Sequence, residues 1–162
     1  MTAGTVCSRE ELSVHLAARR ARGERIVSTN GVFDLLHVGH VRYLAAARLL
    51  GDLLVVGVNS DDSTHRLKGP TRPFNSEDER AEILAALESV DYVTIFGEST
   101  PIELLEVVRP EVHVKGGDYD VAALPETAVV TGYGGRVVTV PFVPGRSSST
   151  LISRIAAAGP AR

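Results

Sequence analysis

Short apolar runs alternate along the chain with longer segments in which apolar residues recur every three or four positions. A short continuous apolar run is typical of a parallel strand that is covered on both faces, and the longer period is typical of a helix. The expected strands lie at Ile26–Val27, Leu53–Val58, Tyr92–Phe96, Val112–Val114 and Arg136–Val140. This alternation predicts an α/β protein with three layers, in which a five-stranded parallel sheet lies between helices.

Several expected helices begin at a capping box, in which a Ser or Thr side chain and a Glu three residues later bind each other's backbone N–H groups. These pairs are Ser8–Glu11, Ser76–Glu79 and Thr100–Glu103, and the run Ser147–Ser149 precedes an expected last helix at Thr150–Ala158. Residues 66–75 contain two prolines and a glycine, so we expect an irregular loop there. We expect a single domain over residues 1–162, with a core at 24–158 and an N-terminal helical appendage at 1–23.

The segment Thr29–His40, TNGVFDLLHVGH, carries the strongest chemical signal. It joins an expected strand to an expected helix, and Gly31 suits the turn because glycine adopts positive φ without a Cβ clash. His37 and His40 are three residues apart at the start of the helix, so they lie on one face. Unpaired N–H groups at a helix N-terminus attract phosphate, and two imidazoles beside them can donate hydrogen bonds as negative charge develops. The segment therefore predicts a site for a reaction of phosphate groups.

Other polar groups follow the expected strands at their carboxyl ends, where ligands bind in α/β sheets. These groups are Asn59–Asp61, Lys115–Asp118 and Ser147–Ser149. The chain has 17 basic residues but only two lysines, Lys68 and Lys115, and each is followed by a glycine. Because arginine occupies nearly every other basic position, the two lysines indicate sites that need a compact ammonium. The sequence contains neither G-x-x-x-x-G-K-[ST] nor G-x-G-x-x-G.

Each signal has a structural alternative. The histidines could be ordinary packed or surface residues, and a zinc site would bring further Cys, His or carboxylate ligands at short spacing, which the sequence does not offer. The serine run could be a simple helix cap, and Lys68 could lie in a basic surface loop. We favour the functional interpretation because these groups fall at one edge of the expected sheet.

Length and composition limit the class of protein and its expected location. A chain of 162 residues buries a sufficient core without disulfides or metals, and Cys7 is its only cysteine. The N-terminus lacks the apolar core of a signal peptide, and no apolar run approaches the length of a membrane span, so we expect a cytoplasmic protein. A formal net charge of −3 and scattered basic residues argue against binding of nucleic acid.

HVGH matches the H-x-G-H signature of nucleotidyltransferases with a Rossmann-like fold, and the whole segment TNGVFDLLHVGH resembles the cytidylyltransferase-like branch of that superfamily. The strings VNSDDSTHRLKGPTRPFN, LAALESVDYV, VKGGDY and GRSSS are similar to those of the heptose 1-phosphate adenylyltransferase group, so the resemblance covers about Ile26 to Ile155. It implies that D-glycero-β-D-manno-heptose 1-phosphate attacks ATP directly, giving ADP-heptose and pyrophosphate, with Mg²⁺ entering on ATP. In that group the domain is often fused to a sugar kinase, so we expect a separate kinase to supply the sugar 1-phosphate. We also expect a homodimer.

The resemblance assigns roles to individual residues. His37, His40 and Lys68 are the expected catalytic residues. The expected nucleotide-binding residues are Thr29, Asn30, Gly31, Phe33, Asp34, His37, His40, Lys115, Gly116, Ser147, Ser148 and Ser149. The expected acceptor-binding residues are Asn59, Asp61, Arg80 and Asp118, and no metal ligand is assigned. The group has Ser-Thr-Thr at the serine run and Asp-Arg at Glu79–Arg80, but hydroxyls and charges are kept here.

Two other functions stay open. One is a CTP-dependent cytidylyltransferase that acts on glycerol 3-phosphate or a similar polyol phosphate. The other is a nucleotide-binding protein without catalytic activity, since one fold can host unrelated functions. The strings RLKG and KGGD favour the heptose substrate, and the presence of His37, His40 and Lys68 counts against the loss of activity.

Overall fold

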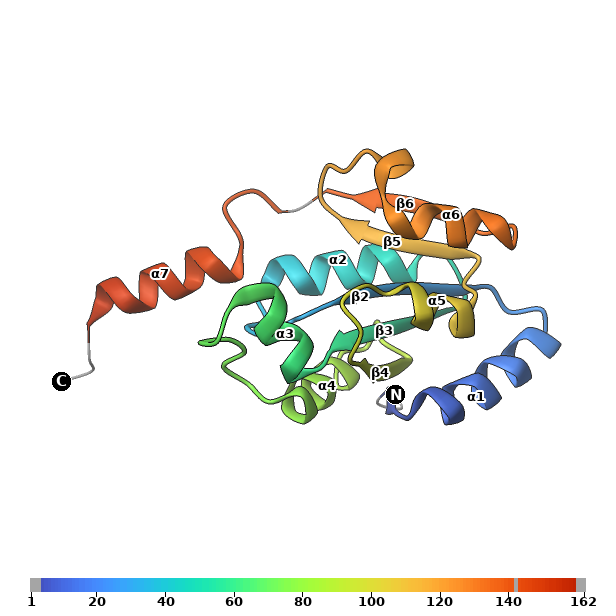
Figure 1. Ribbon diagram of the computed structural model, residues 1–162, viewed down its shortest axis with the longest axis horizontal. Helices are drawn as coiled ribbons and strands as arrows, with labels where there is room; N and C mark the ends of the chain where they lie inside the picture. Colours follow the sequence, from blue (N-terminus) through green and yellow to red (C-terminus); the bar gives the residue numbers. More distant parts are fainter. Residues whose placement is uncertain (1–3, 142, 160–162) are drawn as a thin grey trace.

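The computed structural model describes residues 4–141 and 143–159, and over those residues six strands form one parallel sheet (Figure 1). The order of the strands is β1-β4-β3-β2-β5-β6. Their bounds are β1 Thr5–Val6, β2 Ile26–Gly31, β3 Leu53–Asn59, β4 Tyr92–Phe96, β5 Val112–Gly116 and β6 Arg136–Val140. The sheet therefore contains the five expected strands and one more.

Helices cover both faces of the sheet, so the expected three-layer α/β architecture is confirmed. Helices α2 (Val38–Arg48) and α4 (Glu77–Ala85) pack on one face, and α1 (Arg9–Ala21), α5 (Ile102–Val108) and α6 (Pro125–Gly132) pack on the other. The remaining helices are α3 (Asp61–Lys68), the short 3-10 helix η1 (Val121–Ala123) and α7 (Ser148–Ala158). Figure 1 shows α7 extending away from the sheet. In the described part of the chain, no helix has both the length and the apolar character that a membrane crossing needs.

The central strand β3 explains the continuous apolar pattern of the sequence. All seven of its residues, LLVVGVN, are buried, and successive side chains point to opposite faces of the sheet. Leu54 and Val56 join the core beneath α2 and α4, whereas Val55 joins the core beneath α1 and α5. A Cβ atom on Gly57 would lie 2.6 Å from the side chain of Leu104, so glycine at this position allows α5 to pack closely on the sheet.

The first segment of the chain belongs to the packed domain, which contradicts the expected appendage. Strand β1 pairs with β4 at the edge of the sheet, and Thr5 lies opposite Tyr92. Leu12 and Leu16 of α1 are fully buried in the same cluster as Ile26. The sequence did not reveal β1 because a strand of two residues is too short to produce a periodic pattern.

Two helix starts differ from expectation. The Ser60 hydroxyl accepts the N–H of Ser63 and caps α3, which ends at Lys68, so Lys68 is the last residue of a helix and does not lie in a loop. This helix was missed because Leu67 is the only large apolar residue in DDSTHRLK, which leaves no apolar stripe. Helix α5 has Pro101 as its N-cap without a side-chain hydrogen bond, so the capping box expected at Thr100–Glu103 is wrong.

Candidate functional site

A cavity of about 640 Å³ lies at the carboxyl ends of the central strands. Its walls come from the ends of β2, β3 and β5, the first turn of α2, the end of α3 and the segment that leads into α7. This volume is in the range of sites that bind small ligands. The sequence-predicted residues that line it are Asn30, Gly31, Phe33, Asp34, His37, His40, Asn59, Lys68, Lys115, Gly116 and Ser147–Ser149. Thr29, Asp61, Arg80 and Asp118 were also predicted, but they do not line the cavity.

His37 and His40 cap the start of α2 and thereby fix their own hydrogen-bonding roles. Nδ1 of His37 accepts the backbone N–H of Gly39 at 3.1 Å, and Nδ1 of His40 accepts the backbone N–H of His37 at 3.4 Å. A neutral imidazole that accepts at Nδ1 carries its proton on Nε2. The two rings stack with centroids 4.0 Å apart, and each keeps an Nε2–H donor.

The surroundings also hold both imidazoles in the neutral form. Burial, followed by the neighbouring His37, lowers the pKa of His40 to about 4. Burial and then the charge of Arg146 lower the pKa of His37 below its ordinary value. Because a protonated ring cannot accept a hydrogen bond at Nδ1, helix capping and burial favour the same state. The site therefore presents two neutral donors beside a helix N-terminus, which itself attracts anions.

Residues 31–40 lead from β2 into α2 and carry both histidines, so we call them the histidine turn. Two glycines shape this turn. A Cβ atom on Gly39 would lie 2.8 Å from the ring of His37, so any larger residue would displace that imidazole. The expectation of positive φ at Gly31 is wrong, because the left-handed residue of the turn is Phe33, with φ of 50°. A Cβ atom on Gly31 would lie 3.0 Å from the Phe33 ring. Gly31 thus leaves room for that ring, which packs edge-on against His40.

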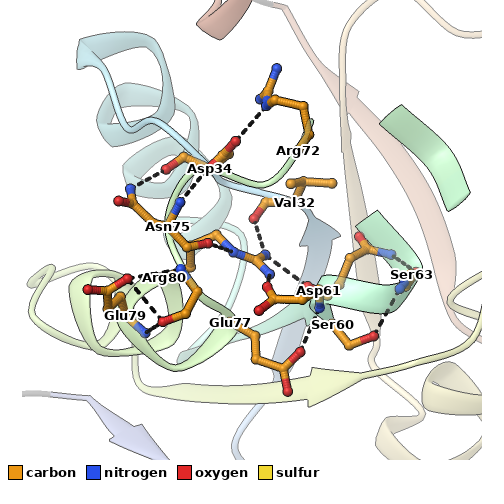
Figure 2. Close-up of polar contacts among 12 residues, drawn as sticks. Val32, Asp34, Ser60, Asp61, Ser63, Arg72, Asn75, Glu77, Glu79 and Arg80 are labelled. Carbon is orange, nitrogen blue, oxygen red and sulfur yellow. Dashed lines mark hydrogen bonds and ion pairs between the residues drawn. The ribbon is translucent and has the colours of Figure 1, made fainter. Parts of the chain in front are cut away.

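Asp34 braces a wall of the cavity. Its carboxylate accepts Nε–H of Arg72 at 2.6 Å and the backbone N–H of Asn75 at 3.0 Å (Figure 2). It also accepts the backbone N–H of Phe74 at 2.8 Å. Burial alone raises the pKa of Asp34, but these hydrogen bonds and the guanidinium charge hold it below its ordinary value. With its side chain about 1% exposed and its oxygens occupied, Asp34 ties residues 72–75 to the histidine turn. This geometry points to a positioning role for Asp34 within the site.

Arg80 lies beneath the cavity and joins three segments of the chain. Its guanidinium donates to the carbonyl oxygens of Val32, Asn59 and Asn75 at 2.7, 2.8 and 3.0 Å, and to the Asp61 carboxylate at 2.7 Å (Figure 2). The Arg80 side chain is fully buried. The structure therefore does not place Arg80 or its partner Asp61 where the expected acceptor contact would need them. It places them in a network that holds the ends of β2 and β3 together.

Thr29 and Asp118 also lie away from the cavity. The Thr29 hydroxyl is buried, and it contacts the Tyr43 hydroxyl and donates to the carbonyl oxygen of Val114 at 2.9 Å. Thr29 thus connects β2 to β5 and to α2. Asp118 is exposed after Gly117, whose φ of 117° makes a turn at the end of β5. Neither residue contacts the cavity in this structure.

The two lysines and the serine run approach the cavity from different sides. Lys68 is exposed at the end of α3. Lys115 extends from β5, and its Nζ lies 2.8 Å from the Glu126 carboxylate and 3.4 Å from Oδ1 of Asn30. Ser147 caps α7 by accepting the N–H of Thr150, and the Ser148 hydroxyl donates to the carbonyl oxygen of Leu35. Ser148 therefore ties the start of α7 to the histidine turn.

Several lining residues were not among the predicted site residues. They are Val32, Gly39, Tyr43, Leu67, Arg72, Tyr119, Val143 and Arg146. Gly39 lies inside the HVGH string, and Tyr119 and Arg146 lie inside VKGGDY and GRSSS, so their positions within these strings were an available signal. Tyr43 had no such signal, because its hydroxyl reaches the site only through the packing of α2 on the sheet. Over the described residues, no three His, Cys, Asp or Glu side chains gather as metal ligands.

A second cavity of about 350 Å³ lies beside the amino ends of β5 and β6. Arg20, Arg109 and Tyr133 are among the residues that line it. None of the sequence-predicted site residues reaches it. The chemistry suggested by the sequence therefore belongs to the larger cavity.

Comparison with known sequences agrees with this arrangement. Residues 28–153 match the profile of a family described as cytidylyltransferase-like. A protein named bifunctional protein HldE from Trichlorobacter lovleyi is 53% identical over 148 residues, which is 91% of this chain and 30% of that protein. The protein of the same name from Syntrophotalea carbinolica is 57% identical over 151 residues, again 91% of this chain and 30% of that protein. The chain thus spans about a third or less of the length of these relatives.

A solved structure shares the fold. The crystal structure of the lipopolysaccharide core biosynthesis protein from Thermoplasma volcanium superposes with a TM-score of 0.62 and 31% sequence identity. The match covers 75% of this chain and 98% of that one.

The Arg80 network predicts a large effect on stability. In Arg80→Met, the carbonyl oxygens of Val32 and Asn59 lose their guanidinium donor, and each unsatisfied buried acceptor costs about 1–3 kcal/mol. We expect the free energy of unfolding, measured by urea denaturation, to fall by about 3–5 kcal/mol. The control is Arg42→Met, because Arg42 is exposed on α2. A loss no larger than that of the control would contradict the assigned role.

Proposed function

The chain belongs to the cytidylyltransferase-like family, and from that premise we propose that it condenses ATP with D-glycero-β-D-manno-heptose 1-phosphate to give ADP-heptose and pyrophosphate. The observation that carries this proposal is the pair of neutral imidazoles, His37 and His40, which keep their Nε2–H donors in one cavity with Lys68. The choice of substrate is supported by the strings RLKG and KGGD and by identities above 50% to HldE proteins.

The proposed reaction is a direct displacement. An oxygen of the sugar 1-phosphate attacks the α-phosphorus of ATP, and a new P–O bond forms. The bond between the α-phosphorus and the oxygen that bridges to the β-phosphate breaks, and pyrophosphate leaves with the electron pair. Such transfers depend on positioning and neutralisation of charge more than on covalent participation by the protein. His37 and His40 donate Nε2–H to phosphate oxygens whose negative charge grows in the transition state.

The remaining groups bind the triphosphate before the reaction. Lys68 supplies a compact positive charge from the end of α3. The N-terminus of α7 and the hydroxyls of Ser147–Ser149 bind the β- and γ-phosphates, because a helix N-terminus offers free N–H groups and a partial positive charge. The hydrogen bond from Ser148 to Leu35 holds this second helix end beside the histidine turn. Two helix N-termini would then face one triphosphate.

We propose that Mg²⁺ enters with ATP, since this cation prefers phosphate oxygens and water to a cage of protein ligands. When bound, it would neutralise charge on the leaving pyrophosphate. A sugar kinase must first phosphorylate the anomeric hydroxyl of the sugar to give the acceptor. We propose that the reaction takes place in the cytoplasm. We also propose that the chain forms a homodimer, which solution scattering would test.

Release of pyrophosphate tests the proposed activity. The purified chain with Mg²⁺ is given ATP, CTP, GTP or UTP, each with D-glycero-β-D-manno-heptose 1-phosphate and separately with glycerol 3-phosphate. We expect release only from ATP with the heptose phosphate. Release only from CTP with glycerol 3-phosphate would contradict the proposal and support a polyol-phosphate cytidylyltransferase. The absence of release from every pair would contradict both activities.

Replacement of one imidazole tests the catalytic role. His40→Ala removes one preorganised donor, and loss of such a donor lowers kcat by about 10²–10³-fold. The variant is compared with His65→Ala, because His65 is exposed on α3 and does not line the cavity. Turnover of His40→Ala close to that of the His65→Ala control would rule out the mechanism.

A further inference from the structure

A buried carboxylate lies behind the cavity wall formed by β5. Glu126 belongs to α6 and is 4% exposed, and its Oε1 lies 2.8 Å from Nζ of Lys115. Burial alone raises the pKa of Glu126, but the hydrogen bond and charge of Lys115 hold it below its ordinary value. The carboxylate is therefore ionised at neutral pH, and it meets the lysine as a full negative charge.

The contacts of Lys115 determine what it can offer a ligand. An ammonium has three N–H donors. One donates to Glu126, and a second is 3.4 Å from Oδ1 of Asn30. Within residues 4–141 and 143–159 no further acceptor contacts this Nζ, so the third is left for a ligand in the cavity that Lys115 lines. Because Glu126 cancels the charge of Lys115, this donor has little net attraction for a phosphate, but it still binds an uncharged oxygen or nitrogen acceptor.

A move of Lys115 onto a phosphate would also be costly. It would leave the Glu126 carboxylate buried without a positive partner, and an uncompensated buried charge is strongly destabilising. His113 does not replace the lysine, although it lies two residues earlier on β5. Burial and then the charge of Lys115 lower the pKa of His113 to about 3, so its ring is neutral, and its Nδ1 contacts the Ser28 hydroxyl at 2.8 Å.

Lys68 also lines the cavity, but its surroundings differ from those of Lys115. It is exposed at the end of α3, and within residues 4–141 and 143–159 no carboxylate pairs with it. Its full positive charge is available to a phosphate. Both lysines line one cavity, but only the charge of Lys115 is balanced by a carboxylate within the described residues.

The wall around Lys115 suits a nucleoside. Gly116 and Tyr119 line the cavity close to Lys115 in the chain, and Tyr119 is 52% exposed. An exposed aromatic ring offers a face on which a nucleobase can stack. The carboxylate, the ammonium and the ring come from α6, β5 and the turn after β5. The ammonium and the ring line the cavity, and the carboxylate behind them balances the charge of the ammonium.

We propose that Glu126 is a positioning residue that keeps Lys115 as a charge-neutral donor to the nucleoside part of the substrate, while Lys68 binds the phosphates. This assignment rests on the proposed function, because it takes a nucleoside triphosphate as the ligand. In this assignment, the nucleoside binds at the wall that carries Lys115, and the phosphates bind at the wall that carries Lys68. The assignment also gives Glu126 a role in selecting a nucleotide over inorganic polyphosphate.

Calorimetric titration with two probes tests the assignment. The full chain is titrated with ATP and with inorganic tripolyphosphate in the presence of Mg²⁺, and the ratio of the two Kd values measures the contribution of the nucleoside. In Glu126→Gln, the Lys115 charge is no longer cancelled, so we expect tripolyphosphate to bind about fivefold more tightly and the preference for ATP to fall. A merely structural role of Glu126 would not strengthen the binding of any probe.

A double variant and a matched single variant complete the test. Lys115→Met/Glu126→Gln removes the donor and the buried charge together, so we expect ATP to bind about tenfold more weakly and tripolyphosphate to change by less than about twofold. Lys68→Met should weaken both probes by a similar factor. Equal weakening of both probes in the double variant would overturn the proposal, as would unchanged tripolyphosphate binding in Glu126→Gln. A chain that binds ATP without releasing pyrophosphate would contradict the proposed function alone.

Discussion

The site depends on one buried guanidinium. The chain turns away from the sheet after β2 and β3, and the carbonyl oxygens of Val32 and Asn59 converge with that of Asn75 beneath the cavity. These oxygens carry partial negative charge and cannot bind one another, so the arrangement needs a donor with several N–H groups in a fixed plane. Arg80 meets this need from α4, and it also holds the Asp61 carboxylate (Figure 2). A lysine would offer a point charge and would lack the planar fork.

The histidine turn is held from one side by the contact of Arg80 with Val32. In this turn, the residues that cap the helix are also the residues that would contact a phosphate. The first N–H groups of a helix need acceptors, and Ser, Thr, Asp or Asn most often provide them. Here His37 and His40 provide them through Nδ1, so the proton of each ring must lie on Nε2. Burial lowers the pKa of His40, so its ring stays neutral and its Nδ1 remains free to accept a hydrogen bond. The same contacts that start α2 therefore prepare two donors for a phosphate.

Much of the fold was predictable because the relevant signals are local. Strand β3 is a continuous apolar run over Leu53–Val58, the other four longer strands contain shorter apolar segments, and Ser8 and Ser76 begin α1 and α4 as expected. The HVGH string and the serine run each lie at a helix start, and the topology brings both to one cavity. Other features depend on contacts distant in sequence. The burial of Arg80, the contacts of Asp34 with residues 72–75 and the pairing of Lys115 with Glu126 have no periodic pattern. The positive φ of Phe33 accompanies the packing of its ring against His40, for which Gly31 leaves room.

The central claim is that the two imidazoles are neutral and carry their protons on Nε2 before a ligand binds. Long-range ¹H–¹⁵N NMR spectra of the histidine side chains report both the tautomer and the charge of each ring. At pH 7, in the ligand-free protein, we predict the neutral Nε2–H form for His37 and His40. On acidification, we predict that His40 stays neutral until the pH approaches its pKa of about 4. An imidazolium at pH 7, or a proton on Nδ1 of either ring, would contradict the account.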